Sequence, residues 1–168
     1  SGMETLLHAL IATVVLSAIM MNSRRYLTLG LLAGISVWVR PDGLTLLGPL
    51  LLAVVLNERD TSSRLKGVFQ ILLGFGGIFL LYLFFNLLVG GTPMPNTFYA
   101  KQAEYSAWQA RPLLDRIGQL ALQLLVGPSF LLIPGVVMWV VRSISNRSWG
   151  SLLAITWSVG YMLLYILR

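Results

Sequence analysis

Residues that could do chemistry are few in this sequence, and the most distinctive group is Arg40-Pro41-Asp42-Gly43. A guanidinium pairs bidentately with phosphate oxygens, so Arg40 predicts a phosphate contact in this turn. A purely structural interpretation is equally open. In that interpretation Asp42 caps the following helix, Gly43 permits a left-handed turn, and the Arg40 side chain extends toward the membrane surface.

A second polar segment runs from Gly90 to Lys101 and holds two Gly and two Pro, which predict a loop. Asn96 is suited to bonding sugar hydroxyls, and Lys101 presents a point charge to a lipid phosphate. Phe98 and Tyr99 are typical of the aromatic belt at a membrane interface. Local reasoning alone favours a simple anchoring loop.

The N-terminal segment places Glu4 at the start of the first apolar run, where a carboxylate favours the positive end of a helix. His8 follows one turn later. As the single histidine of the chain it is predicted to be an interior, hydrogen-bonded residue and not a catalyst. Trp157 could stack on a ring, although interfacial anchoring explains it more simply. With no Cys and one His, no zinc site or other cofactor is predicted.

The composition indicates a membrane protein. Hydrophobic residues make up 57% of the 168 residues and charged residues only 11%, which excludes a disordered chain and is too apolar for a soluble domain. The 12 Lys and Arg exceed the 6 Asp and Glu, but they are dispersed among apolar runs. A nucleic-acid partner is therefore excluded, and the expected partner is a lipid bilayer.

The fold class expected is an all-α, polytopic transmembrane bundle of about six helices, in one domain over residues 1–168. Glycines at Gly30, Gly34, Gly74, Gly76 and Gly77 are expected to allow close helix packing. Both ends of the sequence look internal, so the domain is interpreted as part of a longer protein. The candidate spans are Leu6 to Met21, Leu27 to Val39, Leu44 to Leu56, Val68 to Val89, Ile117 to Val141 and Trp149 to Leu167.

The second and third candidate spans are short and meet at the Arg40 turn. They form either a full hairpin, which we favour, or a helix pair that enters and leaves one leaflet. Alternation of the spans places seven basic residues on one side and five on the other. The positive-inside rule makes the richer side cytoplasmic, so Glu4, Arg40 and the Gly90 to Arg116 loop face outward.

Taken together, Ser1-Gly-Met-Glu-Thr5, Arg40-Pro-Asp-Gly43 and Pro95-Asn-Thr-Phe-Tyr-Ala-Lys101 resemble motifs of the GT-C class of membrane glycosyltransferases. The likeness is to the arabinofuranosyltransferase and mannosyltransferase branch that uses polyprenyl-phosphate sugars. It covers roughly the first 100 residues, in matching order. The resemblance implies a multi-pass enzyme of the bacterial inner membrane that transfers sugar to a glycan, lipid or protein acceptor, without a cofactor.

The resemblance also assigns residues. It implies that Glu4, Arg40, Asp42, Asn96, Tyr99 and Lys101 line the donor site. The acidic catalytic residue of such enzymes precedes the Ser1 motif, so this chain alone is expected to be inactive. Two other functions stay open: a non-enzymatic membrane scaffold or assembly factor of the same architecture, and a secondary transporter. The collection of charges at one surface argues against transport.

Overall fold

The computed structural model describes residues 2–126 and 129–167, and these residues form eight α-helices and one 3₁₀ helix without a strand. The all-helical prediction is confirmed. The elements are α1 (Gly2–Met20), α2 (Tyr26–Val39), η1 (Pro41–Leu46), α3 (Leu47–Asn57), α4 (Thr61–Gly90), α5 (Asn96–Gln109), α6 (Leu113–Leu125), α7 (Ser129–Ser145) and α8 (Trp149–Leu167).

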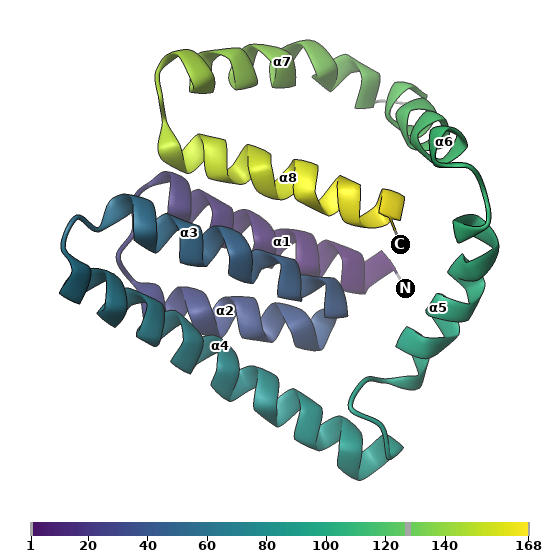
Figure 1. Ribbon diagram of the computed structural model, residues 1–168, viewed down its shortest axis with the longest axis horizontal. Helices are drawn as coiled ribbons and strands as arrows, with labels where there is room; N and C mark the ends of the chain where they lie inside the picture. Colours follow the sequence, from purple (N-terminus) through teal and green to yellow (C-terminus); the bar gives the residue numbers. More distant parts are fainter. Residues whose placement is uncertain (1, 127–128, 168) are drawn as a thin grey trace.

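Helices α1, α2, α3 and α8 run back and forth beside one another, and α4 packs along α2 (Figure 1). The remaining helices, α5 to α7, form an arc from the end of α4 back to α8. Among the described residues, the largest fully buried side chains come from α1, α2, η1, α3 and α4, for example Val15, Val37, Leu46, Val54 and Ile71. The first half of the chain, closed by α8, therefore makes the core.

Small residues bring α2 and α4 together. A Cβ atom at Gly30 would lie 2.5 Å from the Ile71 carbonyl oxygen, and one at Gly74 would lie 2.6 Å from the Leu27 carbonyl oxygen. Gly34 is equally close to Ile78. These three expectations are confirmed, whereas Gly76 and Gly77 have no neighbour within 4 Å at that position and the prediction for them is wrong.

One expected span and one expected loop differ from the structure. The run Ile117 to Val141 is not one helix, because α6 ends at Leu125 with Val126 in an extended conformation, and α7 begins at Ser129. The intervening sequence contains Gly127-Pro128, which lies outside the described residues; such a pair breaks helices. The segment Gly90 to Arg116 is not a loop throughout, because it contains α5 and the start of α6.

Two helices, α1 and α4, are long and apolar enough to cross a membrane, so six spans are not confirmed. Only 28% of residues Met3–Met20 in α1 and 22% of α4 are buried inside the protein, which distinguishes both from the core helix of a soluble domain.

Helices α2 and α3, of 14 and 11 residues, form an antiparallel pair joined by η1 (Figure 1). At 1.5 Å per residue each is about 21 Å or less, short of the roughly 30 Å hydrocarbon core.

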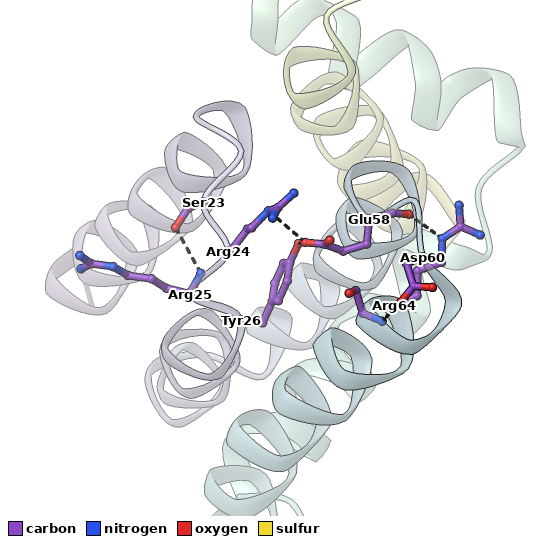
Figure 2. A network of polar contacts seen from close by, with 8 residues as sticks. Ser23, Arg24, Arg25, Tyr26, Glu58, Asp60 and Arg64 are labelled. Atoms are coloured by element: carbon purple, nitrogen blue, oxygen red, sulfur yellow. Dashed lines mark hydrogen bonds and ion pairs between the residues drawn. The ribbon is translucent and has the colours of Figure 1, made fainter.

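The end of the bundle opposite Arg40 is held by a network around Glu58 (Figure 2). This nearly buried carboxylate accepts a 2.8 Å hydrogen bond from the Tyr26 hydroxyl and lies 3.2 Å from Nε of Arg24. Nε of Arg64 donates to the Glu58 backbone carbonyl at 2.6 Å. The network therefore ties the start of α2 to the end of α3 and the start of α4.

Tyr26 in this network gives a prediction on pH. Burial, followed by the hydrogen bond to Glu58, raises the pKa of Tyr26 to about 12, against about 10 in an unfolded chain. The protonated hydroxyl therefore contributes stability in full below pH 10, and this contribution is lost as pH rises through about 12. We expect the tyrosinate absorbance that Tyr26→Phe removes to have its midpoint near pH 12; a midpoint near 10 would contradict the network.

Candidate functional site

The candidate site lies where the start of α1, the end of α2, η1 and the second half of α8 meet. Arg40 ends α2 in an extended conformation, with φ −150° and ψ 134°, and Pro41 begins η1. Proline disfavours a helical conformation in the residue before it, which explains why α2 stops at this point. The sequence Arg40-Pro41 thus fixes the corner from which the guanidinium projects.

The Arg40 guanidinium is held on two sides. Its Nη2 lies 3.2 Å from Oδ2 of Asp42, and its Nη1 donates to Oγ1 of Thr5 on α1 at 3.2 Å. The side chains of Arg40 and Asp42 are 21% and 11% exposed, so the ion pair is partly shielded from solvent. An ion pair of this kind gains more from Coulomb attraction than an exposed one and is also costlier to desolvate.

Asp42 lies in the first turn of η1 and is the N-cap residue neither of η1, where that residue is Arg40, nor of α3, where it is Leu46. The Asp42 carboxylate contacts Arg40 and accepts a 3.3 Å hydrogen bond from the Tyr161 hydroxyl. Gly43 does not adopt a left-handed conformation either; it is needed because a Cβ there would lie 2.5 Å from the Ser36 carbonyl carbon.

Helix α8 closes this corner with two aromatic residues. The Trp157 ring nitrogen donates to Oγ1 of Thr45 at 3.1 Å, and the Trp157 and Tyr161 ring centroids lie 5.4 Å apart. Together with the hydrogen bond from Tyr161 to Asp42, these contacts attach α8 to η1. Interfacial anchoring, which the sequence suggested for Trp157, does not account for its hydrogen bond to Thr45.

His8 is an interior residue, as the sequence predicts. It is 5% exposed, and its Nδ1 lies 2.8 Å from Oγ of Ser36 on α2. Its ring stacks against Tyr161, with the centroids 6.5 Å apart and the planes 27° from parallel. Nε2 is buried without a hydrogen-bond partner among the described residues. His8 therefore positions Tyr161 from the α1 side.

A pocket of about 290 Å³ lies between α3 and α8, next to the polar corner. Tyr161 and Thr45 belong to both the pocket wall and the corner, so a ligand with an apolar part and a polar head would meet both. The lining residues are Thr45, Pro49, Leu52, Thr156, Trp157, Gly160 and Tyr161.

The predicted site residues fall into two groups. Arg40 and Asp42 are in the corner, and Glu4 is exposed in the first turn of α1, next to the Thr5 that Arg40 contacts. Asn96 and Tyr99 are exposed on α5, which lies at the same end of the bundle (Figure 1). The side chain of Lys101, also on α5, lies outside the described residues.

Sequence reasoning missed Thr5, Ser36, Thr45 and Tyr161, all of which contribute hydroxyl groups to the corner. Residues with a hydroxyl group are common in apolar helices, and nothing in their local sequence distinguishes these four. Across residues 2–126 and 129–167, no group of three His, Asp or Glu side chains is placed to hold a metal ion.

Comparison of the chain with protein-family models, curated proteins and solved structures finds no match. A function is therefore inferred from the geometry of the corner and pocket, together with the motif resemblance.

Proposed function

We propose that this chain is part of an integral-membrane glycosyltransferase of the GT-C type, which moves a sugar from a polyprenyl-phosphate donor to an acceptor at the outer membrane surface. The observation that carries the proposal is the partly buried Arg40–Asp42 pair beside the α3–α8 pocket. A lipid phosphate needs a cation for its head and an apolar surface for its chain. The corner and the pocket offer these side by side.

A membrane location supports the proposal. Helices α1 and α4 are able to cross a bilayer and expose large apolar side chains along their length, such as Leu6 and Leu80. The Arg40 corner and the Glu58 network lie at opposite ends of the bundle. We propose a multi-pass arrangement in a bacterial inner membrane, with the Arg40 end outward because the richer basic loops are at the Glu58 end.

The proposed reaction is a displacement at the anomeric carbon of the donor sugar. A hydroxyl oxygen of the acceptor forms the new bond to that carbon, and the bond from the carbon to the phosphate oxygen breaks. The leaving polyprenyl phosphate keeps the electron pair, and Arg40 stabilises its charge. The motif resemblance assigns the hydroxyl proton to a carboxylate that precedes the Ser1 motif in such enzymes.

The other residues have supporting roles in this proposal. Asp42 orients the Arg40 guanidinium and is itself held by Tyr161. Glu4, Asn96, Tyr99 and Lys101 complete the donor site, and their roles rest on the motif resemblance. Asn96 and Tyr99 have hydrogen-bonding groups suited to sugar hydroxyls, and Lys101 adds a second cation for the phosphate.

One observation favours a second function, a non-enzymatic scaffold of the same architecture. Both hydrogen-bonding sides of Arg40 already contact the protein, through Asp42 and Thr5, as a purely structural corner requires. In a scaffold, these contacts would serve only to join α1, α2 and η1. The two functions differ in whether the full-length protein consumes a lipid-linked sugar.

The test is a transfer assay with the full-length protein in lipid vesicles, using a radiolabelled polyprenyl-phosphate sugar and, in parallel, the matching nucleotide sugar. We expect labelled glycan only from the lipid-linked donor. Each candidate sugar is assayed with a membrane extract that supplies acceptors. Binding of the donor without transfer would favour the scaffold, and transfer from the nucleotide sugar alone would overturn the proposal.

A further inference from the structure

Helix α6 has a division of polar and apolar residues that the other helices lack. At 100° per residue, its four polar side chains fall on one narrow stripe, and Leu and Ile occupy most of the remaining circumference. The stripe consists of Asp115, Arg116, Gln119 and Gln123. Such a helix is strongly amphipathic, whereas α1 and α4 are apolar on all sides.

The apolar side of α6 is exposed, unlike that of a helix in a soluble protein. On the polar stripe, Asp115 and Gln123 are exposed, whereas Arg116 is half-buried and its Nη1 donates to the Ile166 carbonyl of α8 at 2.9 Å. On the apolar side, Leu114 is 80% exposed and Leu125 is 53% exposed. In water this arrangement would be unfavourable, because a rotation of α6 about its axis would bury the exposed apolar side chains.

The direction and length of α6 indicate what covers its apolar face. Figure 1 shows α6 foreshortened, seen nearly along its axis, whereas α7 and α8 run across the view. Its 13 residues reach about 20 Å, too short to cross the hydrocarbon core. It begins just after Trp108 and Arg111, whose guanidinium carbon lies 5.6 Å from the Trp ring centre. Trp and Arg are typical of the membrane interface.

We propose that α6 lies in the plane of the membrane interface, with the Leu114 and Leu125 face in the acyl chains of the leaflet at the Arg40 end. Lipid explains the exposed face better than a protein partner, because apolar exposure continues on α7. Phe130, Leu131 and Leu132 are 57%, 78% and 68% exposed. A partner would have to cover both helices, whereas a bilayer covers both without specific contacts.

The chain contains no Cys, so single cysteines can be labelled without background. Leu125→Cys and Gln123→Cys lie two residues apart on different faces of α6 and form a matched pair. Each is labelled with a nitroxide, and the chain is reconstituted in vesicles of phosphatidylethanolamine and phosphatidylglycerol. Collision with oxygen, which concentrates in lipid, is compared with collision with a water-soluble nickel complex.

For the Leu125 label we expect oxygen to dominate, with a depth of about 5 to 10 Å below the phosphates, and for the Gln123 label the nickel complex should dominate. Leu114→Cys, on the same face near the start of α6, repeats the test if the Leu125 variant fails to fold. Equal access of nickel to both faces would mean that α6 lies in water. Shielding of the Leu125 and Leu114 labels from both reagents would mean that protein covers this face; either result overturns the proposal.

Discussion

Replacing Arg40 by Ala is expected to lower sugar transfer by the full-length protein by about 10²- to 10³-fold, the usual cost of removing one preorganised charge-stabilising donor. The leaving phosphate gains charge as its bond to the sugar breaks, so a fixed cation matters more in the transition state than in the bound donor. We therefore expect most of the loss in kcat, measured as initial rates over a range of donor concentrations.

Two variants separate this role from a structural one. Arg40→Lys keeps the charge but not the planar fork, so it should recover only part of the rate. Arg25→Ala removes an exposed cation at the opposite end of the bundle and should leave the rate unchanged. A similar loss in both alanine variants would indicate a general charge effect on the membrane and not a site at Arg40.

A further control addresses the carboxylate that Arg40→Ala leaves behind. Asp42 is only 11% exposed, and without Arg40 its charge loses a partner, which itself disturbs the corner. The double variant Arg40→Ala with Asp42→Asn removes this charge. If transfer returned in the double variant, Arg40 would serve only to neutralise Asp42, and the corner would have a purely structural role.

Much of the fold could be predicted from the sequence because apolar runs and their polar breaks are local signals. The helix expected from Leu27 to Val39 corresponds to α2, and the one from Trp149 to Leu167 corresponds to α8. Gly30-x-x-x-Gly34 indicated a close packing surface, and the structure places α4 against it. The prediction failed after Gly90, because the α5 sequence is not predominantly apolar and a hydropathy pattern cannot identify such a helix.

The candidate site was only partly predictable for a different reason. Arg40 and Asp42 are two residues apart, so the sequence places both in one turn, but their ion pair was not predicted. Tyr161 reaches the same carboxylate from 119 positions along the chain, and Trp157 reaches Thr45 from 112. Contacts at that separation depend on how α8 returns to α1 and α3. No local pattern encodes this return, so neither Tyr161 nor the pocket beside it was expected.

Gly43→Ala is the second change with a large expected effect, and it tests whether the corner depends on backbone packing. A Cβ at position 43 would lie 2.5 Å from the carbonyl carbon of Ser36 and 2.7 Å from the nitrogen of Val37. Both are backbone atoms of α2, and backbone atoms cannot relieve the clash by a rotamer change as a side chain could. We expect a loss of about 1 to 3 kcal/mol in the free energy of unfolding, the usual cost of overpacking.

The same chain segment supplies a matched control at Gly48, where a Cβ has no neighbour within 4 Å. Gly48 lies in α3, so Gly48→Ala should be neutral or stabilising by up to about 1 kcal/mol through helix propensity. Denaturant unfolding in detergent measures both variants. Because Gly43 is adjacent to Asp42, its replacement should also displace the carboxylate that holds Arg40, so transfer should fall in Gly43→Ala but not in Gly48→Ala. Equal stability of the two variants would mean that α2 and η1 are not packed as closely as these distances require.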